Sequence, residues 1–310
     1  MYTLQRFMIM ALDPVHIGTG GYRLGRVDNS ISREPGTNLP KVPGTSLAGA
    51  ARSYAAMRYE KPGCAGQGGK DRQHCGDVRC PICYTFGNTR GNEGGNAGAV
   101  SLADAQLLLF PVHSMAGPIW ATTRARLRQA GFSVTAPDLA RGEFATTMPG
   151  WAKPLNLGWL MLDRRDGAVS VVPPPGAGTV AGWDELARRL VLVDEGLFSQ
   201  IVNSNLEVRT SVSIDPATGA AKEGALFTYE ALPRATLLWC DVVEDDYRAG
   251  NKPWPIAQTH ASKALGETWN SPLDVVKAGL SLAEHLGIGC MGTRGFGRIK
   301  LLAAWEVSHA

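Results

Sequence analysis

The chain lacks the long apolar segments that mark membrane proteins. No stretch approaches the roughly 20 apolar residues that a bilayer-spanning helix needs. It also lacks a secretory signal, because residues 1–14, MYTLQRFMIMALDP, have no separate basic region and no cleavage site of small residues. These absences predict a cytoplasmic protein that does not use a membrane as a partner.

A strong excess of charge of one sign is also missing. The formal net charge is only +3 over 310 residues, whereas nucleic-acid-binding domains are often strongly basic. The 44% hydrophobic and 19% charged content excludes a disordered chain and is enough for a real core. Any polyanionic ligand must therefore be held by local groups of basic residues.

Cysteine is scarce and unevenly distributed. Six cysteines in a cytoplasmic chain are not expected to form disulfides. Four of them lie in the glycine-rich segment 61–97 with the spacing C-x10-C-x4-C-x2-C: Cys64, Cys75, Cys80 and Cys83. This spacing favours a closed, structural zinc site, with His74 as an alternative ligand, over four free thiols. Cys240 and Cys290 stand alone in apolar sequence and are expected in the core.

Residues 16–52 combine glycines, arginines and one carboxylate in a pattern that suits a phosphate backbone. Gly18 and Gly20 have no Cβ, so a ligand backbone can approach them closely. Asp28 is either a functional acid or a residue that neutralises neighbouring arginines. Positive charge and fork-shaped donors come from three residues around it: Arg23, Arg26 and Arg33.

The spacing of apolar residues predicts a mixture of strands and helices. Residues 3–12 form a core strand that ends near His16, which is either a hydrogen-bonded turn residue or a catalytic candidate. A helix capped by Thr45 or Ser46 follows, and its N-terminus either suits a phosphate or merely caps itself. The later elements expected are a strand, a turn and a helix at 98–131 with Pro118 in the first helical turn, helices at 183–193 and 196–203, and a helix from the Ser271 cap to Gly287.

Residues 206–230 predict a hairpin, because their side chains alternate in character up to an Asp-Pro-Ala-Thr-Gly turn. One face carries Arg209 and hydroxyl groups. The arm is interpreted either as a dimerisation strand or as a wedge inserted between bases.

The motif G-x-G-x-x-G at 287–292 occurs in an unusual place. It follows a helix and precedes a strand, which is the reverse of the order in a dinucleotide site. We interpret it as a glycine-rich crossing loop that a nucleic-acid backbone can touch, together with three basic residues: Arg294, Arg298 and Lys300.

Six blocks are spread along almost the whole chain: HIGTG at 16–20, VDNSISRE at 27–34, VPGTSLAGAAR at 42–52, SLADAQLLLFPVHSMAG at 101–117, EGALFTYEALP at 223–233 and the terminal glycine loop. Together they resemble the RAMP superfamily and, within it, the repeating backbone subunit of the type III-B CRISPR effector complex. The fourth and fifth blocks resemble this subunit rather than its type III-A counterpart.

The resemblance implies an α+β fold, with a ferredoxin-like, RNA-recognition-motif-like palm that forms a single RAMP domain over 1–310. Insertions would form a cysteine-rich zinc-binding-like segment at 61–97, a finger or lid at 132–200 and a thumb hairpin at 206–230. The implied partners are guide crRNA, complementary target RNA, further copies of the chain in a filament, and the large, small and capping subunits of the effector.

The resemblance also implies an activity, which is metal-dependent endoribonuclease cleavage of bound target RNA at regular intervals, with Mg²⁺ or another divalent ion. By its position in VDNSISRE, Asp28 is the catalytic residue. Three neighbouring arginines predict a lowered pKa for Asp28, which makes it a poor base and favours a metal-binding role. Two alternatives are a non-catalytic RNA-binding subunit and a guide-processing endonuclease that uses His16.

One departure from the family pattern concerns Ala48, where many members have a lysine that could contact guide phosphate. That contact would move to Arg52, Lys41 or the backbone, or be lost, which lowers salt-sensitive affinity without changing sequence preference. The complete set of predicted RNA-binding residues is His16, Gly18, Gly20, Arg23, Arg26, Arg33, Lys41, Ser46, Arg52, Arg209, Gly292, Arg294, Gly295 and Arg298.

Overall fold

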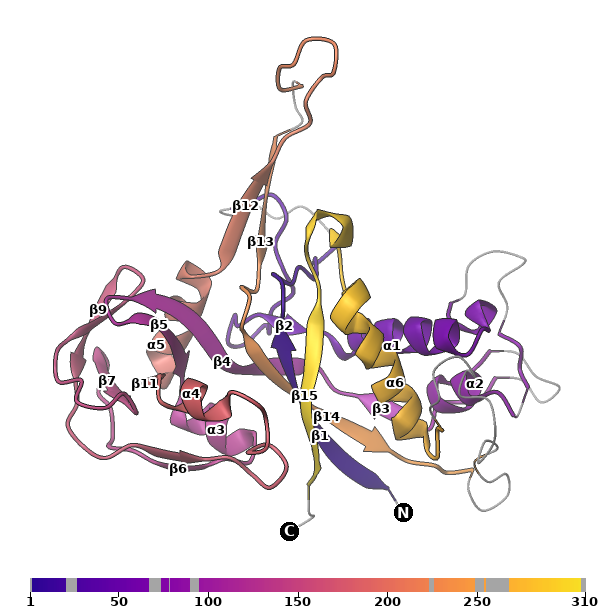
Figure 1. Cartoon of the computed structure of the whole chain (residues 1–310), viewed down its shortest axis with the longest axis horizontal. Coiled ribbons are helices and arrows are strands. Elements are labelled where there is room, and N and C mark those ends of the chain that lie inside the picture. The colour runs from indigo at the N-terminus through magenta and orange to yellow at the C-terminus, as the bar shows by residue number, and fades with distance from the viewer. Residues whose placement is uncertain are drawn as a thin grey trace.

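A mixed sheet of eleven strands runs through the computed structural model of the chain (Figure 1). The structure describes residues 2–20, 27–66, 74–77, 79–89, 95–222, 226–248, 254 and 268–307. The sheet has the strand order β15-β1-β14-β4-β5-β11-β7-β9-β8, with β2 also paired to β4 and β3 to β14. Helices and strands are mixed along the chain, as predicted.

The strands are β1 (Thr3–Ala11), β2 (Lys41–Val42), β3 (Val100–Leu102), β4 (Ala105–Ser114), β5 (Gly117–Thr122), β6 (Ser133–Thr135), β7 (Glu143–Thr146), β8 (Leu155–Leu157), β9 (Leu160–Arg164), β10 (Ser170–Val172), β11 (Leu190–Val193), β12 (Glu207–Ser211), β13 (Phe227–Ala231), β14 (Leu237–Glu244) and β15 (Ile299–Glu306). The helices are α1 (Gly44–Arg58), α2 (Pro81–Phe86), α3 (Arg124–Gln129), α4 (Trp183–Ala187), α5 (Glu195–Ser204) and α6 (Pro272–Leu286), with 3-10 turns η1 (Pro62–Cys64) and η2 (Gly292–Arg294).

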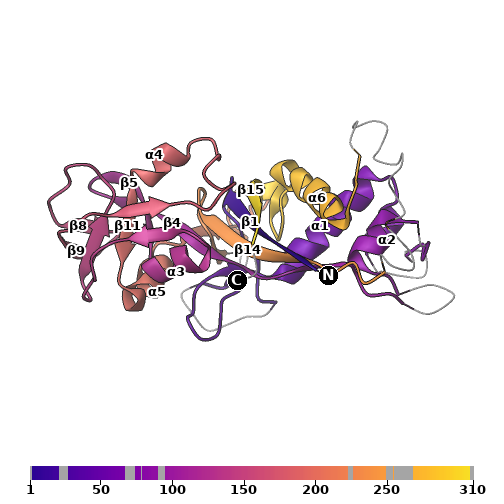
Figure 2. The ribbon, with the colours of Figure 1, turned by 90° about the horizontal axis from the view of Figure 1, so that it is seen from below.

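The central strand β1 lies between β14 and β15 and is antiparallel to both. Side chains alternate between the two faces of a strand, and consecutive residues of β1 are buried, so both of its faces are covered. Phe7 and Ile9 share one core with Leu47 of α1 and Val276 of α6. Figure 2 shows these two helices side by side, with α2 next to them and β8 and β9 at the opposite end.

The second face of β1 is covered by the segment that contains α3 and α4. Met8 packs there in a separate core with Trp239 of β14 and Trp183 of α4. Arg6 also contacts both neighbours: its guanidinium lies 4.3 Å from the centre of the Trp239 ring, and its Nη1 donates to the backbone oxygen of Gln129 in α3 at 2.7 Å. This part of the sheet is therefore covered on both faces.

The segment 132–200 extends the central sheet. β11 pairs in parallel with β5 and antiparallel with β7, and β9 continues the sheet beyond β7. The prediction of a helix at 183–193 is wrong in its second half, because all four residues of β11 are buried between these strands. Pro118 likewise lies in β5, and the following helix α3 is capped by Thr123.

The two long helices begin in different ways. α1 has no side-chain cap, so the prediction of a Thr45 or Ser46 cap is wrong. Instead, the backbone N–H of Gly44 donates to Asp104 Oδ1 at 2.8 Å, and a Cβ at Gly44 would lie only 2.2 Å from a backbone oxygen. α6 begins as predicted, because Ser271 accepts a hydrogen bond from the backbone of residue 274 and Pro272 is its first residue.

The predicted hairpin is confirmed in the described residues. β12 and β13 pair antiparallel from Glu207–Ala231 to Ser211–Phe227, and an isolated bridge joins Ile214 to Ala221 farther out. Figure 1 shows this arm standing away from the body of the molecule. Within the described ranges, no helix is long and apolar enough to span a bilayer.

Candidate functional site

Asp28 lies at the base of the hairpin arm, where its carboxylate is fixed by one residue. Oδ2 accepts hydrogen bonds from the backbone N–H of Thr228 at 2.7 Å and from its hydroxyl at 2.9 Å. The same hydroxyl oxygen accepts from the N–H of Asp28 at 3.1 Å. These backbone and side-chain hydrogen bonds from Thr228 lower the pKa of Asp28. The exposed side chain is therefore an ionised carboxylate at neutral pH.

The lowered pKa of Asp28 was predicted, but Arg33 is not its cause. The Nη1 of Arg33 donates to Glu230 Oε1 at 2.6 Å, and its Nε donates to Asn203 Oδ1 at 3.0 Å. Its side chain is only 16% exposed, so the interior ion pair leaves little of it for a phosphate. Arg23 and Arg26 lie outside the described residues.

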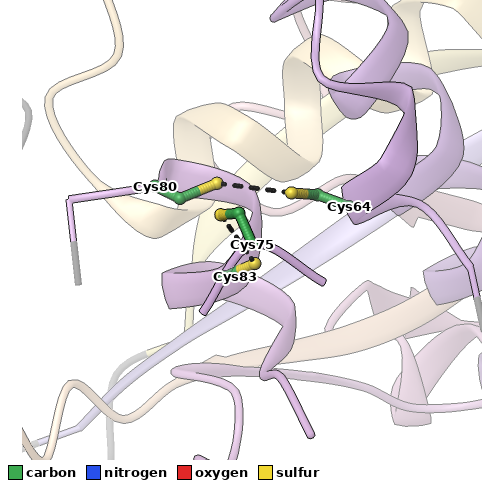
Figure 3. A group of neighbouring side chains, drawn as sticks. All are labelled: Cys64, Cys75, Cys80 and Cys83. Carbon is green, nitrogen blue, oxygen red and sulfur yellow. Dashed lines mark hydrogen bonds between the residues drawn. The ribbon is translucent and has the colours of Figure 1, made fainter. Parts of the chain in front are cut away.

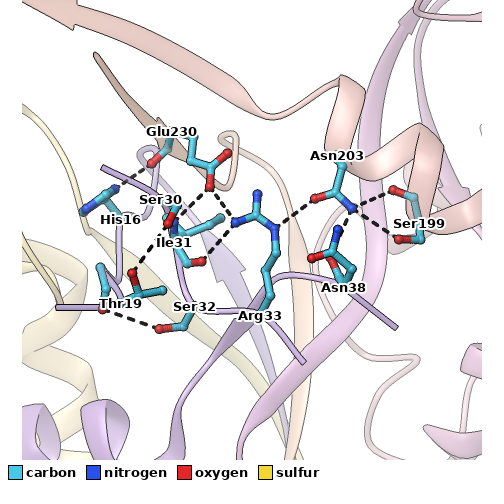
Figure 4. A network of polar contacts seen from close by, with 11 residues as sticks. His16, Thr19, Ser30, Ile31, Ser32, Arg33, Asn38, Ser199, Asn203 and Glu230 are labelled. Carbon is cyan, nitrogen blue, oxygen red and sulfur yellow. Dashed lines mark hydrogen bonds and ion pairs between the residues drawn. The ribbon is translucent and has the colours of Figure 1, made fainter. Parts of the chain in front are cut away.

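Glu230 joins the first glycine loop to the arm (Figure 4). Its Oε1 also accepts from the backbone N–H of Ile31 at 3.0 Å, and the residue is 6% exposed. On the other side of Arg33, the amide of Asn203 donates to the backbone oxygens of Asn38 and Ser199 at 3.1 and 2.8 Å. The loop that carries Asp28 is thus tied to both β13 and α5.

His16 is a buried structural residue, which corrects the expectation of an RNA contact. It is 3% exposed, and its Nδ1 lies 2.6 Å from the backbone oxygen of Glu230, so this nitrogen carries the proton and donates it. The backbone oxygen of His16 accepts from the N–H of Cys290 at 3.0 Å. This contact joins the first glycine loop to the terminal one. Cys290 itself is exposed, contrary to the expectation of a core cysteine, whereas Cys240 is buried as predicted.

Of the residues near the start of α1 that were predicted to contact RNA, Lys41 and Arg52 bind other parts of the protein, whereas Ser46 lines a cleft. The Nζ of Lys41 binds Asp104 Oδ2 at 2.5 Å, and the guanidinium of Arg52 is turned toward backbone oxygens of the cysteine segment. By contrast, Ser46 and Gly292 line one cleft of about 370 Å³ between α1 and the terminal glycine loop. Lys41 is thus paired with a partly exposed carboxylate, and Arg52 is engaged with the cysteine segment. The contact that would replace the lysine absent at Ala48 stays a prediction.

The two faces of β13 carry different chemistry. Thr228 and Glu230 point toward the Asp28 loop, whereas Tyr229 packs on the other face in a small aromatic cluster. Two exposed guanidinium groups lie over aromatic rings of this cluster: Arg209 over Phe296 at 4.6 Å, and Arg294 over Phe227 at 5.5 Å.

Asp13 lies near three arginines: Arg298, Arg234 and Arg209. The first and third were predicted RNA-binding residues, and Arg234 was not. Arg298 binds its carboxylate through two hydrogen bonds of 2.5 and 3.0 Å. Hydrogen bonding and charge from Arg298, with further charge from Arg234 and Arg209, lower the pKa of Asp13. Arg234 had a signal in the sequence, since it directly follows the GALFTYEALP block.

The four clustered cysteines meet in space as predicted (Figure 3). Their sulfur atoms all lie within 4.8 Å of one another, with Cys75 and Cys83 at 3.7 Å and Cys64 and Cys80 at 3.9 Å. A tetrahedron of Zn–S bonds of about 2.3 Å has sulfur separations of about 3.8 Å, so the cluster can hold a metal ion such as zinc. His74 is outside the cluster, because its Nε2 contacts Arg52 at 2.8 Å, and the alternative ligand is not supported.

Comparison with known proteins finds a matching family model and similar CRISPR endoribonucleases. A family model of the RAMP superfamily matches residues 8–300. The CRISPR system Cmr endoribonuclease Cmr4 of Pyrococcus furiosus is 26% identical over 249 residues, which cover 74% of this chain and 78% of that protein. The CRISPR system Cms endoribonuclease Csm3 of Methanothermobacter thermautotrophicus is 34% identical over 82 residues, or 26% of this chain and 31% of that protein.

Solved structures share the fold. A chain in the type III-B Cmr-beta complex bound to cognate target RNA superposes with a TM-score of 0.62 at 14% identity, covering 97% of this chain and 96% of that one. Oligomeric Cmr4 from Pyrococcus furiosus superposes with a TM-score of 0.57 at 18% identity, covering 99% and 100%. The sequence and the fold are thus Cmr4-like, and because the family model matches most of its length, the chain belongs to the RAMP superfamily.

Proposed function

We propose that the chain is a backbone subunit of a type III-B CRISPR effector, which binds guide crRNA, stacks with further copies of itself and cleaves bound target RNA. Two similarities support this proposal: Cmr4 is named an endoribonuclease, and a Cmr-beta chain of the same fold occurs in a complex with target RNA. The order β1-α1-β4-β14-α6-β15 also follows the β-α-β-β-α-β pattern of a ferredoxin-like palm.

The observation that carries the proposal is the placement of Asp28. Its exposed, ionised carboxylate lies at the base of an arm that projects from the body of the molecule (Figure 1). A target strand that crosses the base of the arm would bring a phosphate next to this carboxylate. Thr228, on the arm itself, sets the orientation of the carboxylate through two hydrogen bonds.

The geometry suits attack by the 2′-hydroxyl of RNA on the adjacent phosphate. The 2′-oxygen gives its proton to water and bonds to phosphorus, while the bond from phosphorus to the 5′-oxygen breaks and the 5′-oxygen takes a proton from water. The 2′-oxygen, phosphorus and the 5′-oxygen must lie in line. Stacked A-form RNA does not present them in line, whereas a strand kinked by an inserted arm does. The lowered pKa of Asp28 makes it a poor proton acceptor at neutral pH, so its proposed role is to hold a cation beside the phosphate.

A divalent ion such as Mg²⁺ fits this site with most of its ligands outside the protein. In the described parts of the chain, no group of three potential metal ligands includes Asp28. Magnesium is commonly held by one or two carboxylates together with substrate phosphates and water, which is what Asp28 and an RNA strand offer. When bound, the ion supplies neutralisation of the charge that develops on the phosphate.

The proposed RNA surface combines the cleft at Ser46 and Gly292 with the exposed arginines at the arm, Arg209 and Arg294. Guanidinium groups over aromatic rings offer both charge and a planar face to a nucleotide. Gly18, Gly20 and Gly295 extend the surface, and a Cβ at Gly20 or Gly295 would meet nothing within 4 Å, which leaves space for a ligand backbone.

The cysteine cluster is proposed to hold a structural Zn²⁺. Four thiolates close the coordination sphere, so no position remains for a substrate. Three of the four cysteines are buried, and they join η1 to α2 within a small core that also contains Ile82, Ala55 of α1 and Val275 of α6. Metal analysis of the purified chain tests this part, with one zinc per chain as the expected result.

Target cleavage by assembled complexes that carry Asp28→Asn, with magnesium present, tests the catalytic role. We expect loss of cutting with target binding unchanged. The matched control is Asp138→Asn, an exposed carboxylate paired with Arg124 elsewhere on the surface. Undiminished cutting by the Asp28 variant, or loss of target binding in parallel with cutting, would contradict the catalytic role.

Two alternatives give different results in the same assays. A non-catalytic backbone subunit would leave cutting unchanged in the Asp28→Asn complex. A guide-processing endonuclease would act as a free chain on repeat RNA and lose activity in His16→Ala. The burial of His16 and its hydrogen bond to the backbone of β13 argue against that second alternative.

A further inference from the structure

Arg52 directs its guanidinium into the protein rather than toward the surface where RNA is expected. Its Nε donates to the backbone oxygen of Cys64 at 2.7 Å. Its Nη1 and Nη2 donate to the backbone oxygens of Phe86 and Gly87 at 3.2 and 2.9 Å. Phe86 and Gly87 are adjacent, whereas Cys64 belongs to an earlier segment of the chain. The side chain of Arg52 therefore joins two separate segments.

All three acceptors lie in the two segments that carry Cys64 and Cys83. Cys64 supplies one of the four sulfur atoms. Phe86 and Gly87 end the short helix α2, which contains Cys83 and begins directly after Cys80. The last backbone oxygens of a helix have no partner inside it, so Arg52 satisfies two of them and fixes the end of α2. It thereby joins the segment of Cys64 to the helix that contains Cys83.

The charge of Arg52 also matches the site. A zinc ion with four thiolates carries a net charge of −2, and Cys64, Cys80 and Cys83 are buried. Burial is costly for uncompensated charge. Arginine is protonated at neutral pH, so Arg52 brings a positive charge to the buried site.

We propose that Arg52 is a positioning and charge-compensating residue of the cysteine metal site, not an RNA contact. It acts from α1, outside the coordination sphere, by hydrogen-bonding the two segments that carry Cys64 and Cys83. Groups in this position around a metal are worth about 10- to 100-fold in metal affinity. The inference rests on the zinc site proposed above and is independent of RNA cleavage.

Zinc competition by a chromophoric chelator, performed on the purified full-length chain, tests the inference. In Arg52→Met we expect zinc affinity to fall by about 10- to 100-fold while one zinc still binds at saturation. Arg52→Lys, which restores the charge without the fork of donors, should recover part of the loss. Cobalt substitution gives a second readout, since the absorption of a tetrahedral thiolate site should be weakened or shifted in Arg52→Met.

Arg58→Met is the matched control for a general loss of helix stability. Arg58 is a buried arginine on the same helix, but its Nη1 donates to α6, at the backbone oxygen of Ala278 and the hydroxyl of Ser281. Equal zinc affinity in wild type and Arg52→Met would overturn the inference and leave the zinc site standing. Equal losses in the Arg52 and Arg58 variants would overturn it as well. A wild-type chain that binds no zinc would overturn both the site and the inference.

Discussion

Thr228 hydrogen-bonds the carboxylate of Asp28 across 200 residues of sequence, with its backbone N–H at 2.7 Å and its hydroxyl at 2.9 Å from the same oxygen, Oδ2. The hydroxyl oxygen in turn accepts from the N–H of Asp28. The orientation of the proposed catalytic carboxylate is therefore set by the hairpin arm.

Thr228→Val should reduce target cleavage roughly tenfold, because it removes a hydrogen bond to a charged group while the backbone bond and the side-chain shape remain. Target binding should stay within about twofold of wild type, since no charge is changed. Thr228→Ser keeps the hydroxyl and is the matched control, with near-normal cutting expected. Single-turnover cleavage and equilibrium binding by assembled complexes measure both quantities. Equal cutting by the Val and Ser variants would contradict an orienting role for the hydroxyl.

The pKa of Asp28 makes a second prediction. Its folded value lies below the ordinary 3.8, so any contribution of this carboxylate to stability is present above the ordinary pKa and is lost as pH falls through the folded pKa. Cleavage between about pH 5 and 8 should therefore show no titration of Asp28. Carboxyl carbon NMR of the isolated chain should give a midpoint below 3.8 that moves upward in Thr228→Val. A midpoint above 3.8 would rule out the hydrogen-bonded geometry.

Elements whose signals are local could be predicted from the sequence. The strand β1 needs only its own apolar residues, and α6 has a Ser271 cap, Pro272 and a terminal Gly287 within one segment. The strand β11 was misread as helix, because a short apolar run has no distinctive period and its type depends on pairing. Its neighbours β5 and β7 are separate segments of the chain, which no local pattern reveals.

The residues of the candidate site could be predicted from the sequence, but their interaction partners could not. Asp28 and the four cysteines stand out by residue type and spacing, and the direction of the pKa shift was right. Partners were not predictable, because Arg33 lies five residues from Asp28 in sequence but binds Glu230, 197 residues away. Arg52 similarly occupies a motif position yet serves the interior. The type and spacing of residues can be read from the sequence, whereas the pairing of side chains depends on the fold.

The buried ion pair of Arg33 and Glu230 should be important for stability. Their side chains are 16% and 8% exposed, so removing one partner leaves a charge without compensation. We expect Arg33→Met or Glu230→Gln alone to lower the free energy of unfolding by about 3 kcal/mol. The double variant should cost clearly less than the sum of the two, because it leaves no unpaired charge. Urea unfolding of the isolated chain measures all three.

The surface pair of Arg124 and Asp138 is the control for that cycle. It has a short contact of 2.9 Å, but the Asp138 side chain is 98% exposed. Breaking it should cost less than about 1 kcal/mol. Additive effects of the two changes in the Arg33–Glu230 cycle would mean that the pair is not coupled and that the loop is held by its backbone contacts alone.

The contact between the first glycine loop at His16 and the terminal glycine loop can be tested with two glycines of the terminal loop. Gly289 and Gly295 differ in the space that an added Cβ would have. Gly289 and Gly295 have nearly the same φ, +78° and +79°, so an alanine at either position pays the same cost of about 1–2 kcal/mol for a left-handed backbone. A Cβ at Gly295 meets nothing within 4 Å, whereas one at Gly289 would lie 2.4 Å from the backbone oxygen of His16.

Gly289→Ala should therefore lower the free energy of unfolding by about 1–3 kcal/mol more than Gly295→Ala, because it forces the loops apart. The displacement should also break the hydrogen bond between Cys290 and His16, which amide hydrogen exchange at Cys290 detects as faster exchange. Equal unfolding free energies and equal exchange in the two variants would mean that the terminal loop does not rest on the first one. In that case the position of the Asp28 loop would depend on its contacts with β13 and α5 instead.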